Sequence, residues 1–520
     1  MERYLSILEV SQKQAYIFSS NKLHDNIRRS ALIAWITSPK YFEEVTDDKN
    51  LFDGEKNLVY SGGGHIVLVF DSYEKAVAFN RMVTTAIRKS YEGIEVFVSV
   101  RKYETEGKDG MPLTATKNLS LLKEGLEWKK SIRRASFHQG SFGLATLSAD
   151  TRNVTSDAAS IKMTKDALEL DHWIMPGEYK PAYEFGNLGG TVGDNNYIAV
   201  IHLDGNGMGN RINTFYEANE GKDWEEFRKS VLKYSDAIDA DYKKAFKEMM
   251  QQVADKLDEP DGTLKKELDL KENYFPVRRI ISSGDDVTFV TEGRIGIECA
   301  AMLIEKLNGK TNQWDEAPYS ACAGVAIVHQ KYPFYKAYEL AEQLCSNAKK
   351  FNASLSPSDN GACISSIDWH IEMGEIRDSL EDTRREYNTL DGRRLEMRPY
   401  IISAPPEILK KEAYRSYDRY TYMMKQFREQ DQDEQYSRLK KLRVVLKQGL
   451  RAADDYMNFH KIKEITREGI QLKLTEEDLN KIGSGAEIQY EIFHTTSDGI
   501  DRSILFDAAE SIEFFISLRG

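Results

Sequence analysis

Two parts of this chain carry the same order of predicted elements, and this repeat constrains the fold more than any other feature. The segments YLSILEV at 4–10 and YIAVIHL at 197–203 are rich in Ile, Val, Leu and Tyr, as buried strands are. Each opens a unit that continues with a helical stretch, a strand hairpin, another helix and a further strand. This β-α-β-β-α-β order predicts a ferredoxin-like sheet in each unit.

The hairpins define the two units most sharply. They are VYSGGGHIVLVF at 59–70 and IISSGDDVTFV at 280–290. Around them we expect helices at 21–35, 72–91, 224–271, 294–307 and 333–350, and strands from Ile94, at 320–328 and at 362–368. Because the same sheet forms the palm of polymerases, the repeat predicts a duplicated palm. Two unrelated α+β domains with similar hairpins are the alternative.

The fold class is therefore α+β, with two palm domains followed by a helical region. We expect the first palm at 1–150, a connector with one short helix at 151–190, the second palm at 191–400 and a mainly helical C-terminal domain at 401–520. The tail segment IQYEIFH at 488–494 is a candidate strand. In the C-terminal domain, four leucines have the spacing of the apolar stripe of one amphipathic helix: Leu439, Leu442, Leu446 and Leu450.

The composition excludes several kinds of protein. With 71 Lys plus Arg and 83 Asp plus Glu, the formal charge of −12 disfavours a general nucleic-acid coat. No stretch approaches the roughly 18 apolar residues of a membrane span, and the N-terminus lacks the features of a signal peptide, so we expect a cytoplasmic protein. The cysteines occur singly, which predicts buried, reduced thiols and no zinc site: Cys299, Cys322, Cys345 and Cys363.

Three aspartates stand at strand ends of the second unit. Asp204 directly follows the strand at 197–203, and Asp285 and Asp286 begin the returning strand of the hairpin. A Gly-Asp pair alone more often marks a turn than a ligand. In a palm, however, these strands are neighbours, and three adjacent carboxylates are costly unless cations neutralise them. We therefore expect Asp204, Asp285 and Asp286 to bind two Mg²⁺ or Mn²⁺ ions and to catalyse a two-metal nucleotidyl transfer that releases pyrophosphate.

Glycines and lysines near these strand ends are candidates for nucleotide binding. Gly205 lets the backbone turn close to Asp204. Lys349 and Lys350 end the helix at 333–350 and would face the strand ends, although a solvated helix terminus explains them equally well. In the first unit, a glycine run would let a ligand approach the backbone, with a plain tight hairpin as the alternative: Gly62, Gly63 and Gly64.

The first unit keeps the hairpin but not the acidic pair. Aligning the two hairpins puts Gly64 opposite Asp285 and His65 opposite Asp286, and Ser11 falls opposite Asp204. We therefore expect the first palm to be non-catalytic and to bind a nucleotide or pair with the second palm.

Four segments together resemble one family: the hairpin SSGDDVTFV, the strand end DGNGMG, the stretch AGVAIVHQKYPFYKAYELAEQL and the first hairpin SGGG. They are similar to the polymerase-like large subunit of type III CRISPR effector complexes, a relative of the GGDEF cyclases. The resemblance covers residues 1–400 and, more loosely, the helical C-terminus. It implies that Asp285 and Asp286 are the acidic pair of the family's GGDD motif, that Asp204 is the first-strand metal ligand, and that Ser283 and Gly284 replace the two glycines.

The resemblance also implies an activity and partners. The expected reaction is synthesis of cyclic oligoadenylates from ATP in antiviral defence, with nucleotides held between the two palms. Nucleoside triphosphates, other CRISPR effector subunits and guide or target RNA are the implied partners. A basic stretch is a candidate RNA or partner contact, or else the solvated face of the leucine-striped helix: Arg438, Lys440, Lys441, Arg443, Lys447 and Arg451.

Two departures and two alternatives stand beside this assignment. Asn206 occupies a position where the family often has a second acidic residue, and His24-Asp25 has no partner histidines, so we expect no HD nuclease. A non-catalytic nucleotide-binding scaffold of a ribonucleoprotein is one alternative function. A GGDEF-like cyclase that uses GTP is the other.

Overall fold

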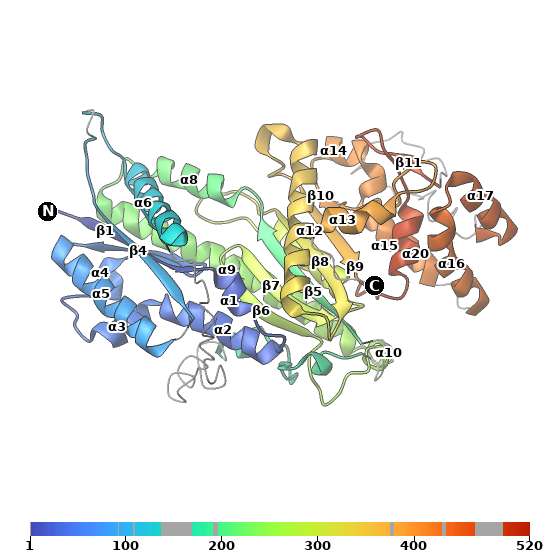
Figure 1. Ribbon diagram of the computed structural model, residues 1–520, viewed down its shortest axis with the longest axis horizontal. Coiled ribbons are helices and arrows are strands. Elements are labelled where there is room, and N and C mark those ends of the chain that lie inside the picture. The colour runs from blue at the N-terminus through green and yellow to red at the C-terminus, as the bar shows by residue number, and fades with distance from the viewer. Residues whose placement is uncertain are drawn as a thin grey trace.

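The computed structural model describes residues 2–91, 93–107, 110–136, 169–190, 196–374, 379–428, 433–462 and 492–519. Figure 1 shows an elongated molecule in which one sheet with its helices lies at the N-terminal end, a second sheet lies in the middle and a helical group lies at the other end. The predicted α+β class, with two ferredoxin-like palms and a helical C-terminal region, is confirmed. Among the described residues, no helix is both long and apolar enough to cross a bilayer.

The first sheet has four antiparallel strands in the order β2-β3-β1-β4, the order of a ferredoxin-like sheet. Its strands are β1 (Tyr4–Ser11), β2 (Leu58–Gly62), β3 (His65–Phe70) and β4 (Glu95–Lys102). Its helices are α1 (Lys13–Ile17), α2 (Leu23–Ile36), α3 (Pro39–Thr46), α4 (Gly54–Asn57), α5 (Tyr73–Ser90) and α6 (Ala115–Ser136). Because side chains alternate along β1, one face of the sheet packs on α5 and the other on α6.

The second sheet repeats this order and extends it. The order is β10-β9-β8-β5-β7-β6, so β8-β5-β7-β6 corresponds to β4-β1-β3-β2, while β9 adds in parallel to β8. The strands are β5 (Tyr197–Gly205), β6 (Val277–Ser283), β7 (Asp286–Glu292), β8 (Ala321–His329), β9 (Ser365–Ile371) and β10 (Tyr400–Ser403). Even the register shift of the first hairpin, between Leu58 and Tyr60, recurs at the equivalent place between Arg279 and Ile281.

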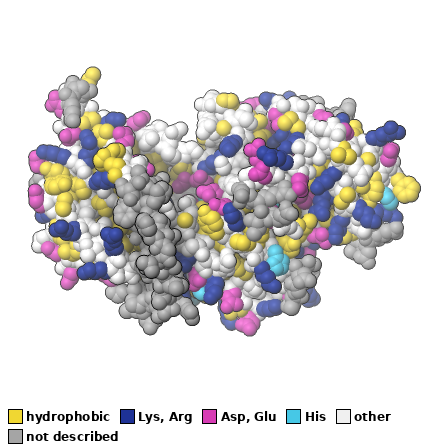
Figure 2. Space-filling model, viewed as in Figure 1, with side chains coloured by type: hydrophobic (Ala, Val, Ile, Leu, Met, Phe, Trp, Pro, Cys, Tyr) yellow, Lys and Arg dark blue, Asp and Glu magenta, His cyan; other side chains and the backbone are white. Residues whose placement is uncertain are grey.

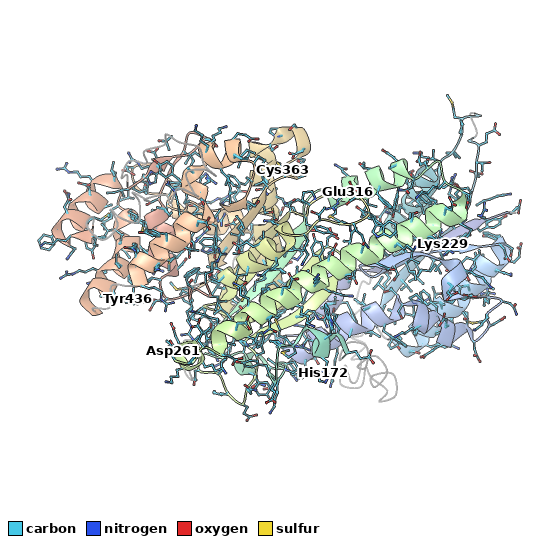
Figure 3. All side chains as sticks on the ribbon, turned by 180° about the vertical axis from the view of Figure 1, so that it is seen from behind. His172, Lys229, Asp261, Glu316, Cys363 and Tyr436 are labelled. Carbon is cyan, nitrogen blue, oxygen red and sulfur yellow. The ribbon has the colours of Figure 1, made fainter. Side chains whose placement is uncertain are left out.

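A long helix joins the two palms. This helix, α9 (Trp224–Leu257), packs on β2 of the first sheet and on β6 and α11 of the second. Its N-terminus is capped by Asp223, whose carboxylate accepts hydrogen bonds from the N–H groups of Glu225 and Glu226. Figure 3 shows α9 running across the back of the molecule from the end that carries Lys229 toward the turn at Asp261. It therefore fixes the relative position of the two sheets.

The other helices cover the second sheet or form the C-terminal group. Around the sheet lie η1 (Phe185–Asn187), α8 (Met208–Ala218), α10 (Thr263–Glu267), α11 (Gly296–Asn308), α12 (Phe334–Leu355), η2 (Pro357–Asp359), α13 (Leu380–Arg384) and η3 (Arg385–Tyr387). The C-terminal group contains α14 (Pro406–Lys411), η4 (Ala413–Arg415), α15 (Tyr417–Arg428), α16 (Asp433–Leu446), α17 (Leu450–Phe459), β11 (His494–Thr495), β12 (Asp501–Arg502) and α20 (Ile504–Ser511).

Two details of the sequence prediction are wrong. The leucine stripe does not continue along one helix, because Gly449 takes a φ of 103° and separates α16 from α17, which leaves Leu450 exposed. Cys363 is exposed rather than buried, because β9 begins only at Ser365 and Cys363 stays in the preceding loop, where Figure 3 labels it. The other three cysteines are buried.

The division of the chain at 150, 190 and 400 stays a prediction. The connector and the tail segment fall partly outside the described residues, which omit 137–168, 191–195 and 463–491. Residues 169–174 are helical, and His494, the last residue of the tail segment, begins β11. The second sheet runs on to Ser403 through the pairing of β10 with β9.

Candidate nucleotide and metal site between the palms

The second palm brings the three predicted aspartates to one end of its sheet. Asp204 lies directly opposite Asp286 in the β5–β7 pairing, so their side chains are on the same face. Asp285 lies in the turn between β6 and β7. A Cβ atom on Gly205 would stand 3.1 Å from Cβ of Asp285, so this turn touches the end of β5. The local pattern of strand end and hairpin thus assembles residues that are far apart in the sequence.

Burial and repulsion act on the two hairpin carboxyls. They raise the pKa of Asp285 and of Asp286 to about 6, with burial as the larger cause and the charge of Asp204 as the next. Oδ1 of Asp286 is buried and has no hydrogen-bond partner among the described residues. His202 Nδ1 is 3.6 Å from this oxygen, which is beyond hydrogen-bond distance.

These carboxylates fit divalent cations. An unpartnered buried oxygen and raised carboxyl pKa values both mark missing positive charge, and hard oxygen ligands suit Mg²⁺ and Mn²⁺. Lys349 Nζ donates to Asp204 Oδ2 at 2.6 Å and to the Gly205 carbonyl at 3.1 Å, which compensates one of the three negative charges. Across the described part of the chain, no three His, Cys, Asp or Glu side chains already converge as a formed metal centre.

A cavity of about 300 Å³ lies where the two hairpins meet. The Gly63 N–H donates to Ser283 Oγ at 2.6 Å, which joins the first hairpin directly to the second. On the face shown in Figure 2, Asp and Glu side chains gather where the two halves of the molecule meet. Of the predicted nucleotide-binding residues, the cavity wall contains Gly62, Gly63, Gly64 and Ser283, together with Asp286.

Glycine is required at the two hairpin turns for different reasons. Gly284 has a φ of 63° with open space around it, and its N–H donates to Asp239 Oδ1 at 3.2 Å. Gly64 has a φ of 77°, and a Cβ there would lie 3.0 Å from Lys13 and 3.1 Å from Ile33. An aspartate equivalent to Asp285 would therefore be both strained and crowded in the first hairpin.

The structure separates the two predicted lysines. Lys349 contacts Asp204, whereas Lys350 lines a different cavity on the other side of α12, toward the C-terminal region. The two side chains diverge because adjacent residues on a helix are rotated by about 100°.

Several side chains at this site were not found from the sequence. Lys13, from the first palm, donates to the Gly63 carbonyl, and its charge lowers the pKa of Asp286 against the larger effect of burial. Helix α9 contributes Asp239 and Lys243 to the cavity wall. It also places Tyr242 beside Gly205, and the buried hydroxyl of Tyr242 lacks a hydrogen-bond partner among the described residues. The spacing of these three fits one face of a helix, but nothing in the sequence connects that face to the hairpins.

The first palm retains a carboxylate that the sequence alignment missed. His65 lies opposite Glu9 in the β1–β3 pairing, so Glu9, and not Ser11, occupies the position of Asp204. Lys130 on α6 donates to Glu9 at 2.7 Å, just as Lys349 on α12 donates to Asp204. Burial and nearby lysines lower the pKa of His65 to about 4, so its ring is neutral near pH 7. The first palm thus carries one compensated carboxylate and a neutral histidine.

Comparison with known proteins agrees with this architecture. Residues 197–354 match the model of the Cas10/Cmr2 second palm domain. No curated protein matches the sequence. Among solved structures, the Csm1–Csm4 cassette with cA4 matches at 12% identity and a TM-score of 0.56, covering 99% of this chain and 70% of that one. The cassette with cA3 and the apo cassette each match at 12% identity and a TM-score of 0.52, covering 98% of this chain and 69% and 70% of theirs.

The two kinds of match confirm the resemblance inferred from the hairpins. The family match covers β5 to α12, the elements that carry the three aspartates and Lys349, and the structural matches extend over nearly the whole chain. The chain therefore contains a second palm of the Cas10/Cmr2 type, inside an overall fold that it shares with the Csm1 structures.

Proposed function

We propose that this chain is a two-metal nucleotidyl transferase that joins ATP units into cyclic oligoadenylates and releases pyrophosphate. The observation that carries the proposal is that Asp204, Asp285 and Asp286 stand at the same end of the second sheet, with Asp286 on the wall of a cavity to which both palms contribute. Of the three carboxylates, Asp204 alone pairs with a described lysine, so bound cations would balance the remaining negative charge, and the cavity beside Asp286 offers room for the substrate.

In this proposal, Asp204, Asp285 and Asp286 hold two Mg²⁺ or Mn²⁺ ions. Such ions, when bound, activate an attacking hydroxyl and stabilise the departing pyrophosphate. The chain's own groups orient the substrate: Lys13 and Lys243 bring positive charge to the cavity wall, and the lack of side chains at Gly62 and Gly63 lets the phosphates approach the hairpin. Apolar side chains of α2, among them Ile33 and Trp35, form another part of the wall and suit a base.

The choice of product rests on the related structures. Cassettes of the same fold are known in complex with cA4 and with cA3. At 12% identity this likeness shows the fold alone, so the adenylate product is the expectation to be tested. The association of Csm1 with Csm4 in those structures favours a second subunit as partner, and we propose that this chain also works within a CRISPR effector complex and close to its RNA.

The test is a product assay with the full chain. Each of the four labelled nucleoside triphosphates is incubated with Mg²⁺ or Mn²⁺, with and without effector subunits and target RNA, and products are identified by mass spectrometry. We expect cyclic oligoadenylates from ATP and at least a thousandfold loss in an Asp285→Ala, Asp286→Ala variant, because both metal ligands of the hairpin are removed. The His65→Ala variant, altered at the matching position of the first palm, serves as the control.

Other outcomes discriminate between functions. A product from GTP alone would indicate a GGDEF-like cyclase. Nucleotide binding without a product, with all partners present, would favour a scaffold. A product that survives the double substitution would refute the assignment of the site.

A further inference from the structure

The second cavity, on the far side of α12, is lined largely by positive charge. It has a volume of about 680 Å³ and lies between α12, α13, the segment before β10 and the β11–β12 hairpin. Six arginines and Lys350 stand on its wall, against three acidic residues. Over this part of the molecule, Figure 2 shows Lys and Arg side chains next to Asp and Glu side chains. Among the described residues, α12 is the element that connects the two sites, because its Lys349 contacts Asp204 whereas its Lys350 lines this second cavity.

Among the six arginines of this wall, Arg415 has the most distant carboxylates. Its side chain is 3% exposed, and its nearest carboxylate oxygens are those of Glu412, 3.5 Å from Nε, and of Asp498, 3.9 Å from Nη2. Nε is buried with no hydrogen-bond partner among the described residues. The guanidinium lies 4.5 Å from the centre of the Phe351 ring, which holds it against α12. Burial and the charge of Arg502 lower the pKa of Arg415 to about 10.

Neighbouring arginines of the same wall add further positive charge. The Nε atoms of Arg384, Arg398 and Arg502 are buried without hydrogen-bond partners in the described structure, and Nη1 of Arg398 lies 3.4 Å from Asp507 Oδ1. These guanidiniums are held in place through their other nitrogens: Nη2 of Arg384 donates to Asp368 at 2.6 Å, and Nη2 of Arg398 donates to Glu510 at 2.6 Å. Positive charges held close together in a largely buried wall are costly, and an anion in the cavity would relieve that cost.

We propose that this cavity binds the phosphate of a phosphorylated ligand of about nucleotide size, with Arg415 as its central cation and Lys350 at its rim. Guanidinium groups match phosphate oxygens in geometry, and a phosphate carries three acceptor oxygens and nearly two negative charges. A carboxylate, with two oxygens, accepts fewer of these N–H groups. The volume is in the usual range of small-ligand sites, and Asn347 and Ser346 line the cavity as polar contacts for the rest of the ligand. The site is independent of nucleotidyl transfer between the palms.

The test measures phosphate binding by the full chain in EDTA, which removes metal-dependent binding between the palms. Pyrophosphate is titrated into wild type, Arg415→Met, Lys350→Met and the control Arg88→Met, whose arginine is exposed on α5 of the first palm. We expect Arg415→Met to weaken the binding of pyrophosphate at least tenfold and Lys350→Met to weaken it about threefold. The affinity of Arg88→Met should equal that of wild type. Because Lys350 is exposed, its variant keeps the test decisive even if Arg415→Met does not fold.

Two further arms identify the source of the phosphate. Competition of AMP with pyrophosphate would indicate a free nucleotide. Binding of a 5′-labelled single-stranded RNA of ten nucleotides, weakened in Arg415→Met and displaced by pyrophosphate, would indicate an RNA backbone. The proposal is overturned if none of these probes binds wild type, or if Arg415→Met and Lys350→Met both bind pyrophosphate as wild type does.

Discussion

The two palms of this chain have the same strand order, the same register shift in the hairpin and the same lysine–carboxylate pair, yet they carry different charge. In the first palm, Glu9 pairs with Lys130 beside a neutral His65. In the second, Asp204 pairs with Lys349, but Asp285 and Asp286 add two carboxylates that no described lysine or arginine pairs with. The lysine–carboxylate pair is therefore common to both palms. The uncompensated negative charge of the second palm comes from the two hairpin residues, Asp285 and Asp286.

In the proposed function the first palm has a supporting role, and the comparison gives a structural reason for it. A side chain at Gly64, where φ is 77°, would be strained and would crowd Lys13 and Ile33. Lys13 in turn reaches the Gly63 carbonyl and the neighbourhood of Asp286. The first hairpin thus lacks the acidic pair and contributes a backbone contact and the positive charge of Lys13 to the second hairpin.

The two palms should differ most when the residues at the same sheet position, Asp204 and Glu9, are substituted. We expect Asp204→Asn to reduce nucleotide transfer by about three orders of magnitude, because a proposed metal ligand is lost, and to abolish Mn²⁺ binding. We expect Glu9→Gln to leave transfer within twofold of wild type and to lower the free energy of unfolding by about 1 kcal/mol, because the Lys130 ion pair is broken. Product assays and urea unfolding measure the two effects. Equal losses of transfer would show that both palms take part in chemistry.

The sequence predicted the fold and the aspartates because both depend on local patterns. Apolar runs of strand length, a glycine turn and acidic residues directly after a strand can be read over ten residues. The equivalence of Ser11 with Asp204 was wrong because cross-strand register, not distance from the strand end, decides which side chains lie opposite each other. Since β1 continues through Ser11, two residues beyond Glu9, alignment at the strand ends misplaced the match.

Contacts between distant segments left no signal in the sequence. Lys130 reaches Glu9 across 121 positions, and the bond between Gly63 and Ser283 spans 220. Neither residue type nor spacing identifies such pairs before the sheets are packed. The arginine-lined cavity is the same case, because Arg415 meets α12 only through the folding of the C-terminal region onto the second palm. Sequence reasoning therefore found the residues of each hairpin but not the surroundings that set their charge.

The paired lysines offer a sharper comparison of metal affinity. Lys349 competes with any cation for Asp204, so we expect Lys349→Met to tighten Mn²⁺ binding by about tenfold, the effect of removing one nearby positive charge. In the first palm, Lys130→Met frees Glu9 but supplies no second carboxylate on the neighbouring strand, so no new Mn²⁺ site should appear there. Titration of Mn²⁺ followed by electron paramagnetic resonance gives both affinity and stoichiometry. Unchanged or weaker Mn²⁺ binding by Lys349→Met would place the metal away from Asp204.

The smallest expected effect is a difference in pH dependence between His65 and Asp286, the two residues at matching hairpin positions. In EDTA, the folded pKa of Asp286 is about 6 against 3.8 for an ordinary aspartate, so its penalty to stability is present at pH 7 and shrinks as the pH falls to 5. The folded pKa of His65 is about 4 against 6.5, so the unfolded chain binds the extra proton and stability falls over the same range.

The two substitutions should therefore change relative stability in opposite directions. Lowering the pH from 7 to 5 should make Asp286→Asn less stable relative to wild type, and His65→Asn more stable relative to wild type, each by on the order of 1 kcal/mol. Urea unfolding at the two pH values measures both differences. Because a bound cation would hold Asp286 ionised, repeating the experiment with saturating Mn²⁺ should remove the pH effect of Asp286→Asn and leave that of His65→Asn intact. If Mn²⁺ left the pH effects of both substitutions unchanged, Asp286 would not be a metal ligand.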